Sequence, residues 1–246
     1  MKVIFLGNQD SSIKGLEYLA EKESDVLVVT QSEELKIVAQ EYNLTAIPEN
    51  KLYKDIGNGN RILEGTDLVI SYGYHKLIKK PLINLPRIGC INFHPAPLPA
   101  FRGMGGVYNF AIYEGVETWG VTAHFVDESF DTGDIIGIRE FKINPEEETA
   151  YSLKEKSHRQ LMILYKSIID AIYEGKELPR TPQWEGRYIS RQDFEQLRRM
   201  QPMDSLEEID RKIRAFWCPP YDGAYIELHG KEFTLVNSKM LKRISE

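Results

Sequence analysis

The sequence predicts an α/β protein with a mostly parallel sheet and helices on both of its faces. Short apolar runs recur along the N-terminal part of the chain, as buried parallel strands do. Segments with the apolar spacing of amphipathic helices follow these runs. The 246 residues are 42% hydrophobic and 28% charged, which is typical of a globular protein, and no apolar run reaches membrane-spanning length.

The strand and helix pairs follow one another in order. The run Lys2–Gly7 ends in glycine, and Ser11–Lys22 continues with helical spacing. The same alternation predicts strands, each followed by a helix, at 25–30 and 33–42, 67–73 and 76–83, and 88–94 and 105–114. This pattern favours a Rossmann-like, doubly wound arrangement.

The character of the chain changes after this alternation. Residues 119–127 and 134–143 are predicted to be neighbouring strands joined by a short turn, so one end of the sheet should be antiparallel. A long helix is predicted over 149–174, with Gly175 at its C-terminal end.

A linking loop should span 178–188, where Pro179, Pro182 and Gly186 interrupt regular structure. The capping box Ser205-Leu-Glu-Glu208 begins a helix that Cys218-Pro-Pro220 ends, and 224–228 and 232–236 read as a β-hairpin. We therefore expect an N-terminal Rossmann-like domain over 1–189 and a small C-terminal helix and hairpin appendage over 190–246.

Composition excludes several classes of protein. Two cysteines, Cys90 and Cys218, give neither a disulfide framework nor a cysteine-rich metal site. Four of the five histidines, His75, His124, His158 and His229, lack the spacing of metal ligands. We expect structural or surface roles for them. The N-terminus enters a strand at once without a signal-peptide pattern, so a cytoplasmic protein is expected.

The first loop does not predict a dinucleotide site. Gly7-Asn-Gln-Asp-Ser-Ser-Ile-Lys-Gly15 lacks the Gly-x-Gly-x-x-Gly spacing, so NAD binding is not expected. The loop leads into a helix N-terminus, which suits a phosphate or carboxylate; in the alternative reading, Ser11 or Ser12 only caps the helix.

The segment Cys90-Ile-Asn-Phe-His-Pro-Ala-Pro-Leu-Pro99 is the most informative stretch. Side chains alternate along a strand, so Asn92 and His94 face one side while Ile91 and Phe93 face the other. The three prolines stiffen the chain that follows, which suits a preorganised site. Alternatively, Asn92 and His94 only satisfy a strand end and a turn.

A second polar cluster lies in the turn between the two later strands. Residues 127–134 hold four acidic side chains within eight positions. Such carboxylates are often merely solvated, but ligands of α/β sheets gather outside the carboxyl ends of strands.

Four linked blocks resemble the signature of the folate-dependent formyltransferases over residues 1–175: Asn92-Phe-His-Pro95, Leu98-Pro-x-x-Arg-Gly103, Gly120-Val-Thr122 and Asp131-Thr-Gly-Asp-Ile-Ile136. The resemblance implies that Asn92, His94 and Asp131 act together on N10-formyltetrahydrofolate, without a metal.

The chemistry of formyl transfer agrees with this. An amine that attacks a formyl carbon builds negative charge on oxygen and positive charge on nitrogen. The Asn92 amide can donate to the oxyanion, His94 can donate or shuttle the proton, and Asp131 can orient His94 or a water and favour its charged form.

The net charge and further motifs restrict which amine can accept the formyl group. The family acts on methionyl-tRNA, glycinamide ribonucleotide or nucleotide-linked amino sugars. The net charge of −6, and an almost neutral 176–246 with 13 Lys and Arg against 12 Asp and Glu, disfavour tRNA and any other nucleic acid. The segments 94–99, 102–109 and 214–223 resemble sugar N-formyltransferases.

We therefore expect transfer to the amino group of a dTDP-4-amino-4,6-dideoxyhexose, for surface polysaccharide such as O-antigen. The alternatives are a dTDP-3-amino-3,6-dideoxyhexose, methionyl-tRNA, or a non-catalytic protein that binds folate or a sugar nucleotide. A homodimer is expected, because a two-stranded hairpin is marginal alone; no membrane partner is expected.

The resemblance also implies the binding residues. Folate should contact Tyr74, Lys76, Leu77, Ile78, Asp127 and Phe130. The sugar nucleotide should contact Asn8, Ser11, Lys14, Arg102, Gly103, Trp217 and Tyr221, with Lys14 and Arg102 suited to the pyrophosphate, and Phe216, Trp217 or Tyr221 to stacking on thymine.

Overall fold

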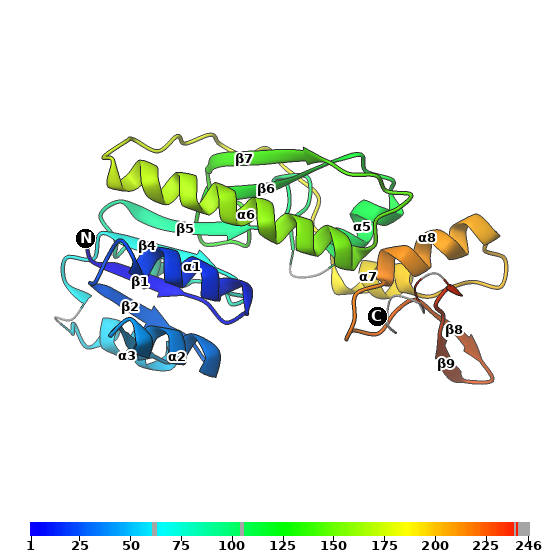
Figure 1. Ribbon diagram of the computed structural model, residues 1–246, viewed down its shortest axis with the longest axis horizontal. Helices are drawn as coiled ribbons and strands as arrows, with labels where there is room; N and C mark the ends of the chain where they lie inside the picture. The colour runs from blue at the N-terminus through cyan, green and yellow to red at the C-terminus, as the bar shows by residue number, and fades with distance from the viewer. Residues whose placement is uncertain (61–62, 104–105, 239, 241–246) are drawn as a thin grey trace.

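A seven-stranded sheet forms the core of the N-terminal part of the protein (Figure 1). The computed structural model describes residues 1–60, 63–103, 106–238 and 240. The strands lie in the order β3-β2-β1-β4-β5-β6-β7. β1 to β5 are parallel, and β6 is antiparallel to both β5 and β7. Their bounds are β1 Val3–Leu6, β2 Val26–Val29, β3 Thr45–Ile47, β4 Leu68–Tyr72, β5 Gly89–His94, β6 Thr118–Phe125 and β7 Ile135–Lys142. The predicted antiparallel end is confirmed.

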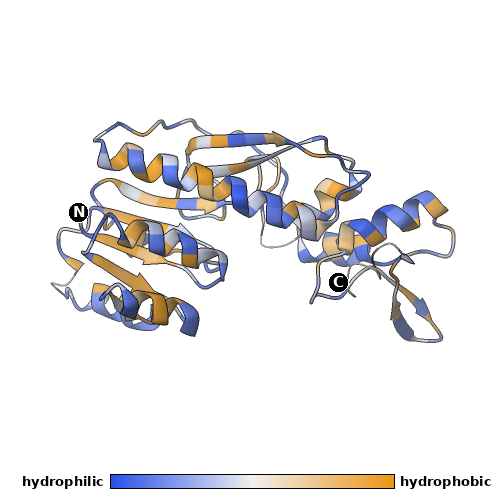
Figure 2. Ribbon diagram, viewed as in Figure 1, coloured by the Kyte–Doolittle hydropathy of each residue, from blue (hydrophilic) through white to orange (hydrophobic). Residues whose placement is uncertain are grey.

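Helices cover both faces of this sheet, as predicted. One face packs on the long helix α6 and on α1, around Phe5, Phe93 and Tyr165. The other carries Ile4 and Val69 in a second apolar cluster. In β1, β2 and β4, alternate residues therefore enter different cores, and these strands are apolar along most of their length (Figure 2). These helices are α1 Ser11–Ala20, α2 Glu33–Glu41, α3 Glu49–Gly57, α4 Lys80–Ile83, α5 Val107–Tyr113 and α6 Ala150–Tyr173.

Three elements were not predicted, and one predicted helix is wrong in extent. β3, α3 and the C-terminal helix α7 (Arg191–Arg198) have no counterpart in the sequence prediction. The helix expected over 76–83 is only the single turn α4. Its start is explained by Pro81, which a helix tolerates only in its first turn, so 76–79 stays extended or bent. The helix expected from Gly105 is described from Val107, and Gly105 itself lies outside the described residues.

The C-terminal segment adds α7, α8 (Leu206–Phe216) and the predicted hairpin, β8 (Tyr225–Leu228) with β9 (Lys231–Thr234). Ser205 caps α8 by accepting from the Glu208 amide at 3.2 Å. Phe216 of α8 shares an apolar cluster with Trp119 of β6. The division at residue 189 stays a prediction, and residues 239 and 241–246 of the expected appendage lie outside the described part of the chain.

Candidate active site

Asn92 and His94 lie at the carboxyl end of β5, between β4 and β6. Ile91 and Phe93 enter the core beneath α6, so the two polar side chains occupy the opposite face of the strand, as the alternation predicted. In the antiparallel register with β6, Asn92 lies opposite His124.

The His94 ring is buried, and its orientation is set by the loop that follows the prolines. Its Nε2 lies 3.0 Å from the Phe101 carbonyl oxygen. Since a carbonyl only accepts, Nε2 carries the proton in the neutral ring and Nδ1 keeps a lone pair. That free Nδ1 lies 3.6 Å from Oδ1 of Asp131.

The Asp131 carboxylate faces two imidazoles at once. Its Oδ1 is 3.6 Å from His94 Nδ1 and also 3.6 Å from His124 Nε2. The residue sits in the turn between β6 and β7 with a φ of +55°, in the left-handed region that few residues other than glycine adopt. The structure therefore brings together all three residues that the sequence singled out for catalysis.

His124 is the functional candidate that sequence reasoning missed. Its Nδ1 lies 2.7 Å from the Phe125 carbonyl oxygen and so carries the proton, which leaves Nε2 to accept from the Asn92 Nδ2 group at 3.0 Å. One Asn92 N–H is used in this way, and its second N–H has no acceptor among the described residues. The signal that could have found His124 is its place near the end of the strand that was predicted beside the acidic turn.

Electrostatics favour a neutral ring beside a charged carboxylate. Burial lowers the pKa of His94 below its usual value, and the Asp131 charge counteracts this in part. Burial alone would raise the pKa of Asp131, but His94, His124 and the backbone amide of Gly103 lower it to about 2. At neutral pH, a lone pair on His94 Nδ1 thus faces an anion that would stabilise a proton placed on it.

The residues expected to contact folate divide between two segments. Leu77 and Phe130 are 39% and 36% exposed, so an apolar surface is available on each segment, whereas Ile78 is buried in the core. Asp127 accepts from Thr132 Oγ1 at 2.6 Å and from the Ser129 amide at 3.0 Å, which braces the acidic turn. A salt bridge of 2.8 Å between Lys80 and Glu128 joins the two segments. An apolar wall with few polar contacts suits a pterin ring.

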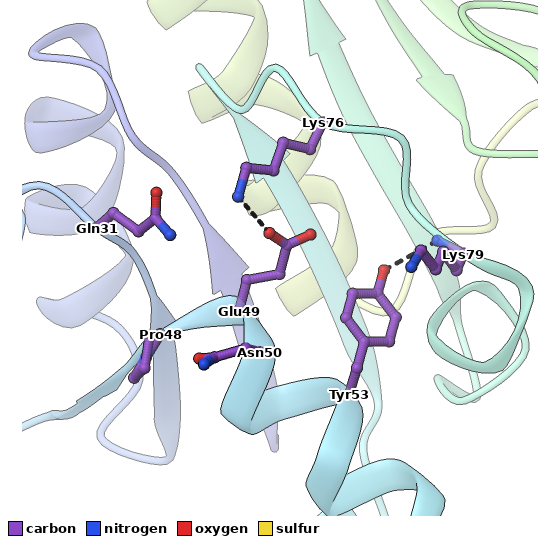
Figure 3. Close-up of a pocket in the computed structure, with 7 residues that line it drawn as sticks. All are labelled: Gln31, Pro48, Glu49, Asn50, Tyr53, Lys76 and Lys79. Carbon is purple, nitrogen blue, oxygen red and sulfur yellow. Dashed lines mark hydrogen bonds and ion pairs between the residues drawn. The ribbon is translucent and has the colours of Figure 1, made fainter.

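Lys76 and Tyr74 are committed to Glu49 at the start of α3. Lys76 Nζ lies 2.5 Å from the Glu49 carboxylate. Burial is the main cause that raises the pKa of Tyr74, and the hydrogen bond between Tyr74 and the same carboxylate raises it further. Lys76 and Glu49 line an open cavity of about 510 Å³ beside β2 and β3 (Figure 3). None of Asn92, His94 and Asp131 lines this cavity.

The residues expected to contact the sugar nucleotide do not all remain free for a ligand. The Asn8 side chain accepts from the Gln31 amide at 2.7 Å, and Ser11 lies 3.4 Å from the Gln9 side chain. Arg102 donates from Nη2 to the Trp184 carbonyl at 2.8 Å, while its buried Nε has no partner among the described residues. Lys14 is exposed.

The remaining candidates lie near the catalytic loop or after α8. The backbone amide of Gly103 bonds to Asp131. Trp217 is half-buried, and Tyr221 is 69% exposed with Lys154 Nζ 5.9 Å from its ring centre. Phe216 is not available for stacking on thymine, because it is 2% exposed and packs on Phe194.

An amide donor, a neutral imidazole with a free lone pair and a carboxylate thus meet at the carboxyl end of β5. Such a set can stabilise an oxyanion and accept a proton from an attacking amine. No group of three or more His, Cys, Asp or Glu side chains suited to a metal ion occurs in the described part of the chain. The fold and this cluster define an α/β enzyme of the acyl-transfer class.

Comparison with known proteins identifies the family. Residues 1–169 match the formyl transferase family, and the chain belongs to it, which confirms the prediction of a folate-dependent formyltransferase. A methionyl-tRNA formyltransferase of Agathobacter rectalis is 28% identical over 98% of this chain and 81% of its own.

Solved structures share the whole fold. A 4-N formyltransferase from Francisella tularensis is 25% identical, with a TM-score of 0.77 over 96% of each chain. An N-formyltransferase from Helicobacter canadensis, described in complex with folinic acid and dTDP-3-aminofucose, is 21% identical, with a TM-score of 0.75 over 94% of this chain and 86% of its own.

Proposed function

We propose that this formyltransferase moves the formyl group of N10-formyltetrahydrofolate to the free amino group of a dTDP-4-amino-4,6-dideoxyhexose. The observation that carries the catalytic part is the convergence of three side chains: His94 Nδ1 and Asp131 Oδ1 are 3.6 Å apart, and Asn92 lies two residues before His94 on the same strand face. The wider role would be the synthesis of surface polysaccharide such as O-antigen.

Each residue has a separate part in the transfer. The unused N–H of Asn92 donates to the formyl oxygen as the amine nitrogen bonds to the formyl carbon and negative charge develops on that oxygen. His94 Nδ1 takes the proton that the attacking nitrogen loses, and Asp131 stabilises the resulting imidazolium. His94 then returns the proton to the departing folate nitrogen as the bond between that nitrogen and the formyl carbon breaks, so protons and electrons balance.

The choice of a sugar amine rests on charge and on one comparison. A net charge of −6 gives no electrostatic attraction to tRNA, whose binding depends on neutralised phosphates. The likeness to a 4-N formyltransferase extends over 96% of both chains, which supports the 4-amino position. The Helicobacter protein keeps the 3-amino sugar as the second candidate, and the curated relatives keep methionyl-tRNA as the third.

A panel of amines tests this proposal. The purified protein is incubated with N10-formyltetrahydrofolate and dTDP-4-amino, dTDP-3-amino or methionyl-tRNA acceptors, and the added formyl group is read by mass. We expect the 4-amino sugar to be formylated with the highest kcat/KM. Preference for another acceptor would overturn the substrate assignment. Wild-type rates in both Asn92→Ala and His94→Ala would overturn the catalytic one.

A homodimer built on the hairpin is part of the proposal. Leu228 and Phe233 are each 49% exposed on a two-stranded sheet that no further strand covers among the described residues. Because such a hairpin is marginally stable alone, a second copy is the expected cover. Sedimentation should give a dimer for the wild type and a monomer for Phe233→Glu; a monomeric wild type would exclude the homodimer.

A cytoplasmic location stays a prediction. No described helix has the length and apolarity to span a bilayer.

A further inference from the structure

The segment 181–189, here called the strap, lies beyond the part of the chain that matches the family. It contacts both the loop after β5 and the chain that follows the turn between β6 and β7. At one end, Thr181 and Ile135 exchange backbone hydrogen bonds of 2.8 and 3.0 Å. At the other end, the backbone amide of Arg102 donates to the Arg187 carbonyl at 3.1 Å, and the backbone carbonyl of Arg102 accepts from the Ile189 amide at 3.0 Å. The strap is therefore paired to the chain on both sides of the catalytic cluster.

One strap side chain reaches the catalytic turn itself. Gln183 Nε2 donates to the carbonyl oxygen of Gly133 at 2.5 Å, two residues after Asp131. Its Oε1 is buried and has no partner among the described residues, so this single hydrogen bond holds the amide in place. A buried oxygen without a hydrogen bond carries a free-energy cost, so the contact of this side chain with the turn rests on its N–H donor alone.

The backbone conformation of Asp131 explains why the turn needs a contact that holds it in place. Asp131 has a φ of +55°, a left-handed conformation that few residues other than glycine hold unless their surroundings impose it. The Asp131 side chain must also keep Oδ1 within 3.6 Å of two separate rings. A small relaxation of the turn would move the carboxylate away from one ring or both.

The strap is also seated closely against the other loop. A Cβ added at Gly186 would lie 1.9 Å from the Pro99 carbonyl oxygen, so the backbones touch where only glycine fits. Phe101, in the same loop, holds His94 through its carbonyl oxygen. Both the imidazole and the carboxylate thus depend on loops that the strap contacts.

We propose that Gln183 is a positioning residue for formyl transfer, which holds the Asp131 carboxylate against His94 and His124 through the Gly133 carbonyl. This inference rests on the catalytic roles proposed above for Asn92, His94 and Asp131. Gln183 acts through the turn and touches no reacting atom.

Two variants of Gln183 and one matched control test the proposal in the full-length protein. Gln183→Ala removes the donor, and Gln183→Glu keeps the shape but replaces the donor with a carboxylate at neutral pH. Glu185→Ala is the control, because Glu185 is an exposed strap residue whose side chain makes no hydrogen bond or ion pair with the described residues. We expect kcat to fall roughly 10- to 100-fold in both Gln183 variants, with KM values within about threefold of wild type.

The pH dependence separates positioning from folding. As the pH falls toward the pKa of the new carboxyl, Gln183→Glu regains an O–H donor, so its rate relative to wild type should rise; that of Gln183→Ala should stay flat. Equal rates for Gln183→Ala, Glu185→Ala and wild type would overturn the proposal. So would losses in Gln183→Ala that appear only in KM.

A readout without turnover keeps this test separate from that of the function. The chain has 5 histidines, so the imidazole resonance of His94 can be followed by NMR titration. In Gln183→Ala, the pKa of His94 should move toward its value in Asp131→Asn, and an unchanged value would overturn the proposal. If the wild type formylated none of the amines, the proposed function would fail, while the titration would still decide the role of Gln183.

Discussion

His124 Nε2 lies 3.0 Å from Asn92 Nδ2, across the antiparallel pair of β5 and β6. The Phe125 carbonyl fixes the proton of His124 on Nδ1, so Nε2 is available to accept from the amide. This bond orients the Asn92 side chain with its NH₂ group, rather than its carbonyl oxygen, toward the histidines. In the proposed mechanism, the second N–H of that group donates to the formyl oxygen.

Replacement of His124 by leucine should therefore impair catalysis more than binding. Without an acceptor, the Asn92 amide can rotate, and we expect kcat to fall roughly 10- to 100-fold with little change in KM. His124→Gln, whose amide oxygen can accept, should recover part of the loss. Steady-state kinetics check this, with His229→Gln in the hairpin turn as the control. Equal rates for His124→Leu and the control would show that His124 does not orient Asn92.

The rate should depend on the protonation of His94. Since burial lowers the pKa of His94, the neutral base persists below pH 6.5, and kcat/KM should decline only as the pH falls through that lowered pKa. The Asp131 charge raises the His94 pKa, so Asp131→Asn should move this acid limb to lower pH. The plateau should also fall, by roughly 10²- to 10⁴-fold. A limb that moves to higher pH would contradict the assignment of His94 as the base.

The sequence supports some parts of this site well and others poorly. Alternation along a single strand places Asn92 and His94 on one face, because that rule is local. The roles proposed for Asp131 and Gln183 depend on a turn and a strap that approach β5 from distant parts of the chain, and spacing does not encode such contacts. His124 was overlooked for a related reason: its place opposite Asn92 follows from the register between two strands.

The same distinction explains the fold. Strongly apolar strands such as β1 and β4 were predicted because both faces are buried. β3 has three residues, of which only Ile47 is buried, and α7 buries no residue, so neither gives a clear apolar period. α6 and α8 were predicted from their caps as much as from their spacing.

Gly133 should be required for the stability of the catalytic turn. A Cβ at this position would lie 1.9 Å from the Phe125 carbonyl oxygen, a contact that only backbone movement can relieve. Gly133→Ala should lower the free energy of unfolding by about 1–3 kcal/mol. It should also lower kcat, because Asp131 is two residues away.

Gly137, in the neighbouring strand, provides the control for this substitution. A Cβ there would meet only Leu164, at an ordinary distance of 3.8 Å, so Gly137→Ala should stay within about 0.5 kcal/mol of wild type. Urea unfolding at neutral pH measures both. If the two substitutions had equal effects, the close approach at Gly133 would not be a constraint.

His158 on α6 should make the protein less stable in mild acid. Burial, aided by the positive charge of Lys154, lowers its pKa from 6.5 to about 4, and its buried Nδ1 has no hydrogen-bond partner among the described residues. Below pH 6.5, the unfolded chain takes up a proton at this residue that the folded protein does not. The folded state therefore loses stability as the pH falls from about 6.5 to 4.

His158→Phe removes the titrating group. The free energy of unfolding of this variant should therefore decline by roughly 2–3 kcal/mol less than that of wild type over this range. Urea unfolding at pH 7 and at pH 4.5 measures the difference, and parallel declines in the two proteins would show that His158 does not remain neutral in the folded state.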